Sequence, residues 1–169
     1  MSQFYEITPE QIEKNPFTLI GKEWMLIAAE KEGKVNAMTA SWGGVGVLWN
    51  KNVIFGFVRP QRYTKEFVEA GDYFSLTFFD ESYKKDLQYF GTVSGRDEDK
   101  IEKCGFSTCS DENAPYFAEA NMAIICKKLY AGNIDPSAIL MPEIDKTIYP
   151  DKDYHIVYIG EIVKVLKKD

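Results

Sequence analysis

Strict alternation of apolar and polar residues constrains this chain more than any other feature. In residues 73–80, Phe74, Leu76 and Phe78 fall on one face of an extended chain, which is the two-residue period of a β-strand. Other segments are apolar, β-branched or bounded by turn residues in the way that predicts strands. They are residues 24–30, 35–41, 45–49, 53–58, 122–130 and 154–166. The pattern favours a sheet protein over a helical bundle.

Two expected hairpins and several short helices complete this outline. Hairpin turns are expected at 32–34 and 50–52, and Gly43-Gly44, taken alone, suggests a turn that connects strands. Thr8-Pro9-Glu10-Gln11 has the capping pattern of a helix that runs to about Lys14. Residues 84–90 and 99–104 are further short helical candidates, and the irregular segment between Asp135 and Pro142 could include a helical turn. Strands with interposed helices predict a mainly β fold, an antiparallel barrel with peripheral helices.

Length and composition set the class of protein. The 169 residues fit a single domain, 1–169, in which we expect residues 1–20 to form an N-terminal extension with a short helix. The net charge of −6 without a concentrated basic face argues against nucleic acid as a partner. We also expect no membrane span, because no apolar run approaches roughly 18 residues. The acidic N-terminus does not resemble a signal peptide, and three cysteines are an odd number, so we predict a cytoplasmic protein.

Metal binding and nucleophilic catalysis have little support in the sequence. Cys104 and Cys109 are separated by four residues, which matches no common zinc or redox pair, and Cys126 lies within an apolar run. His155 is the single histidine. We therefore predict no metal site. No motif supports a Ser–His or Cys–His pair, although such chemistry stays open.

Two polar clusters are the main candidates for a binding site: residues 36–44 and 59–64. Arg59 and Arg62 carry planar, permanently charged donor forks that suit an oxyanion such as phosphate. Thr64 stands where a helix over 63–70 would begin, as its expected N-cap, and free amides there also favour an anion. Trp42 beside two glycines offers an apolar face to a flat ligand. The clusters suggest a phosphorylated aromatic molecule. The alternative is that Thr64 only caps its helix, both arginines lie on the surface and Trp42 is a core residue.

Taken together, these residues resemble the flavin reductase-like family of FMN-binding split barrels. The matching stretches are 36–44 (N-x-M-T-A-S-W-G-G), 58–67 (V-R-P-Q-R-Y-T-K-E-F), Ser94-Gly95 leading to Lys100, and 155–163 at the closing strand. The likeness extends roughly from Trp24 to Val165. The first two motifs are specific in combination, although each alone is modest.

The resemblance implies a homodimer with FMN near the subunit interface. It implies that Met38, Thr39, Ala40, Ser41 and Trp42 line the isoalloxazine ring and ribityl chain. Arg59, Tyr63 and Thr64 would surround the phosphate, and Lys100 would approach the flavin and tune its potential. Asn36 would hold the loop or contact the cofactor, and His155 is a candidate for the nicotinamide or substrate side.

The function expected from this likeness is that of an FMN-dependent oxidoreductase, with NAD(P)H as a co-substrate in a flavin reductase. No dinucleotide fingerprint is present, so nicotinamide use follows from the resemblance alone. One alternative is a flavoredoxin-like electron-transfer protein that is reduced by a redox protein partner. Another is a non-enzymatic split-barrel protein that binds a different ligand, such as haem, or none.

Overall fold

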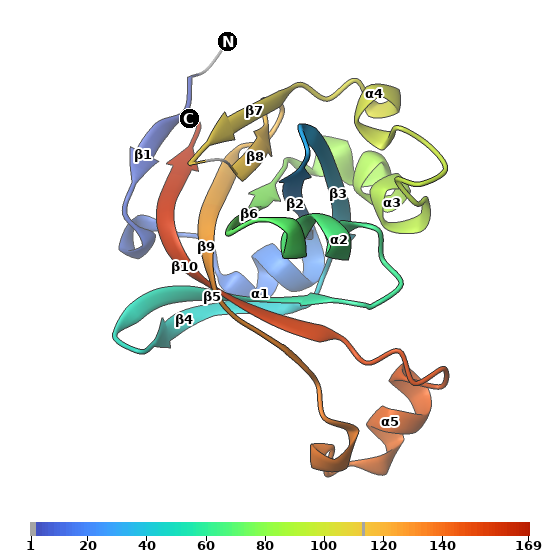
Figure 1. Cartoon of the computed structure of the whole chain (residues 1–169). Coiled ribbons are helices and arrows are strands. Elements are labelled where there is room, and N and C mark those ends of the chain that lie inside the picture. The colour runs from blue at the N-terminus through green and yellow to red at the C-terminus, as the bar shows by residue number, and fades with distance from the viewer. Residues whose placement is uncertain (1–2, 113) are drawn as a thin grey trace.

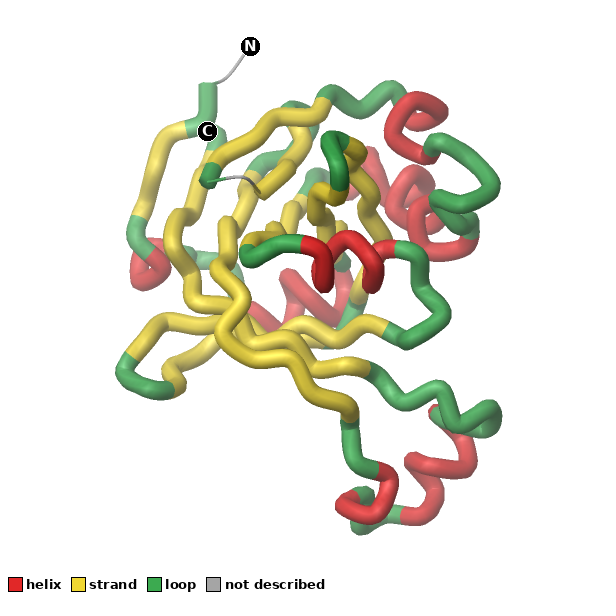
Figure 2. Tube along the Cα trace, in the orientation of Figure 1, coloured by secondary structure: helices red, strands yellow, loops and turns green. Residues whose placement is uncertain are grey.

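A curled antiparallel sheet forms the body of the protein (Figures 1 and 2). The computed structural model describes residues 3–112 and 114–169. The eight strands of the main sheet are β1 (Tyr5–Ile7), β2 (Met25–Lys31), β3 (Lys34–Ala40), β4 (Gly43–Leu48), β5 (Lys51–Val58), β6 (Tyr73–Phe78), β9 (Met122–Asn133) and β10 (Ile156–Lys167). Their order is β3-β2-β6-β9-β10-β5-β4, and β1 pairs with the far end of β10. The predicted mainly β, antiparallel split-barrel class is confirmed.

The sheet does not close, and its two edges are neighbours in the chain. Strand β3 pairs only with β2, and β4 only with β5, among the residues described. Ser41 and Trp42 connect these two edge strands. The opening of the barrel therefore coincides with the loop that the sequence marks as a binding segment.

The β4–β5 hairpin differs from its expected form in two details. The turn consists of Trp49 and Asn50, both with positive φ (53° and 58°), and not of residues 50–52. A two-residue turn of this kind matches the natural twist of paired strands. Gly43 and Gly44 lie inside β4, not in a connecting turn. A Cβ on Gly43 would lie 2.8 Å from the Phe55 carbonyl oxygen, so glycine permits the close pairing seen there.

The N-terminal helix is shorter than the sequence indicated. A 3₁₀ turn covers only Pro9–Gln11, although the Thr8 amide donates to the Gln11 side chain over 2.8 Å, as a capping box requires. Ile12 is already extended, and no residue of the turn is buried, so no apolar face sustains a longer helix. The neighbouring strand β1 is paired within the main sheet, so part of the expected extension belongs to the barrel.

All labelled helices except α5 lie around the barrel (Figure 1). The helices are α1 (Pro16–Thr18), continued by a π-helical turn at Leu19–Glu23, α2 (Thr64–Ala70), α3 (Lys84–Thr92), α4 (Lys100–Cys104) and α5 (Pro142–Ile148), with 3₁₀ turns at Glu81–Tyr83 and Pro136–Ala138. A small hairpin, β7 (Thr108–Asp111) with β8 (Ala114–Phe117), covers one end. No helix among the described residues is long and apolar enough to cross a membrane.

Two hydrophobic clusters hold these parts together. Apolar side chains of β2, β5, β6, β9 and β10 fill the barrel, including Ile27, Ile54 and Phe74. A second cluster, rich in phenylalanine, packs α3 against the barrel exterior through Leu87 and Phe90. This second cluster fixes the C-terminal end of α3, and α4 is the next helix along the chain.

The segment between β9 and β10, residues 134–155, is called the arm. It contains Pro136–Ala138 and α5, in agreement with the expected helical turn, and it projects away from the barrel (Figure 1). Its last residues return to the barrel, because Asp153 bonds Arg59 at the end of β5. The arm thus brings residues far along the chain to the edge of the barrel opening.

Candidate functional site

A cavity of about 250 Å³ lies at the barrel opening, where the chain passes from β3 to β4. We call it the first cavity. It brings together seven of the residues predicted from sequence: Met38, Thr39, Ala40, Ser41, Trp42, Arg59 and His155. Phe57 and Arg62 complete its lining. The 38–42 segment singled out in the sequence lines this one cavity, whereas nothing in the sequence indicated that Phe57 would also line it.

A second cavity, of about 130 Å³, lies between the start of α2 and the loop that follows α3. Four predicted residues meet there: Asn36, Tyr63, Thr64 and Lys100. The remaining lining residues are Gln61, Arg62, Thr92, Val93, Ser94 and Gly95. Arg62 lines both cavities, and Arg59 lines only the first. The expected grouping of Arg59 with Tyr63 and Thr64 is therefore not seen within either cavity.

The second cavity contains two cations held on the end of a helix. Arg62 donates from Nη1 to the Gly91 carbonyl (3.0 Å) and from Nη2 to the Phe90 carbonyl (3.2 Å). Lys100 donates from Nζ to the same Phe90 carbonyl over 3.0 Å. These carbonyls belong to the last turn of α3, whose dipole favours positive charge. The helix end fixes both cations but supplies no full negative charge.

No carboxylate neutralises this pair. None of the ion pairs formed within residues 3–112 and 114–169 includes Arg62 or Lys100. Lys100 is only 3% exposed. Burial, assisted by the Arg62 charge, lowers the pKa of Lys100 to about 8, and burial also lowers the pKa of Arg62. An anion that entered the cavity would relieve both effects.

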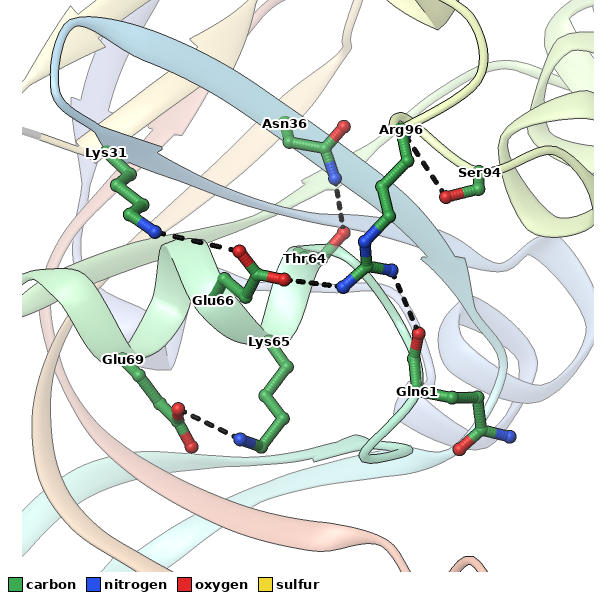
Figure 3. A network of polar contacts seen from close by, with 9 residues as sticks. All are labelled: Lys31, Asn36, Gln61, Thr64, Lys65, Glu66, Glu69, Ser94 and Arg96. Atoms are coloured by element: carbon green, nitrogen blue, oxygen red, sulfur yellow. Dashed lines mark hydrogen bonds and ion pairs between the residues drawn. The ribbon is translucent and has the colours of Figure 1, made fainter.

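The wall of the second cavity depends on close contact between Asn36, Thr64 and Gly95. The Asn36 amide donates to the Thr64 hydroxyl over 2.8 Å, and both side chains are buried (Figure 3). Thr64 is the first residue of α2 and does not cap it, since Tyr63 holds the N-cap position. A Cβ on Gly95 would lie 2.0 Å from Asn36 Oδ1 and 3.1 Å from the Tyr63 ring. Only glycine fits at this position.

A network of charges ties the 94–96 turn to α2 (Figure 3). Arg96 donates to the Gln61 carbonyl (3.2 Å) and pairs with Glu66 (2.5 Å), and it lies over the Tyr63 ring. Lys31 approaches the other oxygen of Glu66 at 3.6 Å. Because these groups are exposed, the network adds modest stability. It nevertheless gives Arg96 an acidic partner that Arg62 and Lys100 lack.

The guanidinium of Arg59 is bonded to the arm. Nη1 donates to Asp153 over 2.6 Å, Nη2 donates to the Ile148 carbonyl over 3.1 Å, and the group lies over the Tyr149 ring. Gln61 donates to the same Asp153 oxygen over 2.7 Å. These contacts lower the pKa of Asp153, chiefly through the Gln61 and Arg59 hydrogen bonds. The charge of Arg59 is thus largely satisfied within the protein.

Aromatic rings surround the remaining part of the first cavity. Trp42 is 47% exposed, and its ring centroid lies 5.2 Å from that of His155. Phe57 approaches His155 edge-on at 6.4 Å. Burial, with the nearby Arg59 charge, lowers the pKa of His155 to about 4. The imidazole is therefore neutral at physiological pH, and it forms an aromatic patch with Trp42 and Phe57 on the cavity wall.

Other features of the molecule stand apart from this site. A larger cavity, about 790 Å³, lies between α2 and the arm and is lined by none of the predicted site residues. No group of three or more His, Cys, Asp and Glu side chains in the described chain is arranged to hold a metal ion. Burial raises the pKa of the Cys104 thiol to about 11, so this cysteine is not an activated nucleophile.

The open antiparallel barrel, with one cavity at its opening and a cationic cavity beside it, defines a split-barrel protein. The chain belongs to the family described as the flavin reductase like domain, whose model matches residues 18–169. The family resemblance drawn from the sequence is thereby confirmed. A search among curated proteins found no match.

Solved structures with the same fold include several flavoproteins. Flavoredoxin from Methanosarcina acetivorans has a TM-score of 0.68 and 23% identity over 87% of this chain and 69% of that chain. The FMN-binding domain of a flavin reductase-like enzyme from Shewanella baltica has a TM-score of 0.71 and 16% identity, over 99% and 78%. An NADH:FAD oxidoreductase from Streptomyces globisporus has a TM-score of 0.65 and 14% identity, over 86% and 75%. At these identities the likeness shows the fold. Family membership supports a flavin-binding oxidoreductase.

Proposed function

We propose that this protein is an FMN-dependent oxidoreductase in which the two cavities together hold one FMN. The observation that carries the proposal is a pair of cations, the half-buried Arg62 and the buried Lys100, with no acidic partner among the described residues. A phosphate beside them would supply the missing negative charge, and Arg–phosphate contacts are among the strong hydrogen bonds of proteins. The absence of a side chain at Gly95 lets Asn36 and Tyr63 pack against the turn that forms the wall of this cavity.

The residues that line the two cavities suggest which part of FMN each cavity would bind. In the second cavity, Arg62 and Lys100 would hold the phosphate beside Thr64, Asn36 and Tyr63. In the first cavity, the 38–42 segment would line the ring system, with Trp42 as apolar cover. Arg62, which lines both, would lie between the two parts of the ligand.

FMN, when bound, supplies the electron-transfer chemistry, so the chain itself needs no nucleophile. The protein's contribution is to bind, to orient and to set the electrostatic surroundings. Because Lys100 lines the cationic cavity and not the aromatic one, we assign it first to anion binding. Its influence on the flavin potential, expected from the sequence, remains a secondary prediction.

Flavin binding is tested by the spectrum and melting temperature of the purified protein. We expect FMN to give a visible flavin band and a thermal shift, since ligand at 100 times Kd adds about 2.7 kcal/mol of stability. Riboflavin should stabilise less, because it lacks the phosphate. Absence of any shift with FMN would favour the alternative of a split-barrel protein with another ligand, such as haem, or none.

For the reductant, we propose NAD(P)H, as in a flavin reductase. The support is the family description and the likeness to an NADH:FAD oxidoreductase. The competing proposal is a flavoredoxin-like protein that takes electrons from a redox protein partner, and the likeness to flavoredoxin supports it. Anaerobic stopped-flow absorbance separates the two. Bleaching by NADH or NADPH supports the reductase, whereas bleaching only by a reduced redox protein supports the second.

We further propose a homodimer, as the family resemblance implies. The exposed large apolar side chains include Val47 and Trp49 at the β4–β5 hairpin and Leu140, Met141 and Ile144 on the arm. Exposed apolar groups that gather in this way commonly mark an interface. Sedimentation equilibrium tests the proposal, with L140E expected to shift the protein toward monomer. A monomeric wild-type protein at micromolar concentration would reject it.

A further inference from the structure

His155 meets a second buried group that the proposed function does not use. The hydroxyl of Tyr149, at the end of α5, lies 2.8 Å from His155 Nδ1. Tyr149 is 4% exposed and His155 is 7% exposed. Their rings are also in edge-to-face contact, with centroids 5.6 Å apart. The arm therefore holds the imidazole by one specific nitrogen.

The other ring nitrogen is directed away from this contact. No hydrogen bond to Nε2 is formed within residues 3–112 and 114–169, and His155 lines the first cavity. Among the described residues, Asp153 Oδ1 is the only fully buried side-chain nitrogen or oxygen without a hydrogen-bond partner. Because Nε2 also has no partner there, it must be in contact with solvent. Nε2 is thus the nitrogen available to a ligand in the first cavity.

Burial is the main cause of the lowered pKa of His155, and the Arg59 charge adds to it, so the ring is neutral. Arg59 opposes a positive charge on the ring, and Asp153, which would favour one, is already bonded to Arg59 and Gln61. Tyr149 is the titratable group in direct contact, and Trp42 and Phe57 are apolar. A neutral imidazole has one donor nitrogen and one acceptor nitrogen. The position of the proton therefore decides whether His155 presents a hydrogen-bond donor or an acceptor to the first cavity.

We propose that Tyr149 is a positioning residue that fixes His155 in the tautomer with its proton on Nε2. A phenol is a good donor, and its proton finds an acceptor in Nδ1. If Nδ1 donated instead, the phenol proton would lack an acceptor within the described chain, which is costly for a buried group. The first cavity is therefore given a neutral N–H donor that suits a carbonyl oxygen. That this carbonyl belongs to a flavin or nicotinamide rests on the proposed function.

Nitrogen NMR tests the assignment without any cofactor, because His155 is the only histidine of the chain. Long-range ¹H–¹⁵N correlations of the labelled protein at pH 7 should show Nδ1 unprotonated and Nε2 protonated. We expect Nε2–H to exceed Nδ1–H by roughly tenfold, as for one typical hydrogen bond. In Y149F, which keeps the ring beside Arg59, the excess of Nε2–H over Nδ1–H should fall. A wild-type protein with Nδ1–H, or with an imidazolium, overturns the proposal.

The matched control is Y154F. The Tyr154 ring packs against Tyr149 at a tilt, with centroids 4.8 Å apart, and its hydroxyl bonds Asp145, but among the described residues it makes no hydrogen bond to His155. Its removal should leave the tautomer unchanged, whereas an equal loss in both variants would point to a general loosening of the arm and overturn the specific role of Tyr149. With FMN added, the Nε2 signal should move more than the Nδ1 signal. Failure to bind FMN would reject the proposed function and leave the tautomer assignment standing.

Discussion

The two cavities differ in how their cations are satisfied. In the first, Arg59 is bonded to Asp153 and to a carbonyl of the arm, and the neutral His155 lies beside the Trp42 ring. In the second, Arg62 and Lys100 share the carbonyl end of α3 without a carboxylate. The first cavity contains three aromatic rings, and the arm neutralises its Arg59, although Arg62 also lines it. The second carries positive charge that no carboxylate among the described residues balances.

This difference favours Arg62 over Arg59 as the arginine that an anion would contact. Arg59 and Arg62 are three residues apart and chemically identical, yet the arm occupies the fork of only one. A charged group that is already paired gains little from a second anion, while an unpaired buried cation gains much. If the two cavities bind different parts of one ligand, substitutions in them should affect FMN and riboflavin differently.

The largest expected effect is that of R62A on phosphate recognition. Loss of a charge-assisted contact worth about 1.5–3 kcal/mol should weaken FMN binding by roughly 10- to 100-fold. Riboflavin, which has no phosphate, should lose no more than about threefold. Titration by fluorescence quenching measures both. R96A is the control, because Arg96 lies near the same cavity but is paired with Glu66. Equal weakening of the two flavins in R62A would contradict the assignment of the second cavity.

The next effect is steric and concerns the wall of the second cavity. In G95A, the new methyl group would collide with Asn36 and Tyr63, so either the Asn36–Thr64 hydrogen bond or the turn must shift. Overpacking of this kind costs about 1–3 kcal/mol. We expect a lower melting temperature and roughly tenfold weaker FMN binding.

The control for this substitution is G46A, since nothing lies within 4 Å of a Cβ at Gly46. It should leave FMN affinity unchanged. If G95A bound FMN as tightly as the wild-type protein, the second cavity would have to be wider than the contacts of Asn36 and Tyr63 allow.

A smaller effect is expected for R59Q, and it should not depend on the phosphate. The substitution removes the ion pair with Asp153, which anchors the arm beside the first cavity. The binding of FMN and the binding of riboflavin should weaken by the same factor, about two- to fivefold, as expected for the loss of a partly exposed ion pair. The pKa of His155 should rise, because the Arg59 charge helps to lower it. A selective loss of FMN would instead restore Arg59 to the phosphate, as the sequence suggested.

The sequence was most informative where neighbouring residues share one site. The segment Met38–Trp42 could be recognised because its residues are consecutive and join two edge strands. The roles of Arg59 and Arg62 could not be separated, because Asp153 and the α3 carbonyls that distinguish them come from distant parts of the chain. Thr64 was expected to cap α2, but Asn36, from β3, engages its hydroxyl. Long-range contacts of this kind leave no local pattern.

The smallest effect is a pH dependence that belongs to the second cavity alone. The pKa of Lys100 is lowered to about 8, so the ammonium is charged at pH 7 and largely neutral at pH 9.5. FMN affinity should therefore fall by a few-fold between these two values. The affinity for riboflavin should change less over the same range. In K100M the affinities for the two flavins should depend on pH to the same extent. Isothermal titration calorimetry in buffers of different ionisation heat should also show proton uptake when FMN binds near pH 8.

The same residue makes an independent prediction for the ligand-free protein. Between pH 8 and pH 10.5 the unfolded chain binds a proton at Lys100 that the folded protein has lost, so this residue makes stability rise with pH across that window. Below pH 8 the cost of the buried charge is fully present, at most roughly 3 kcal/mol at 1.36 kcal/mol per pKa unit. K100M should therefore gain stability over the wild-type protein at pH 7, and the gain should shrink toward pH 10. A variant that is less stable at both values would show that the bond to Phe90 outweighs the cost of burial, and that the second cavity needs no anion to balance its charge.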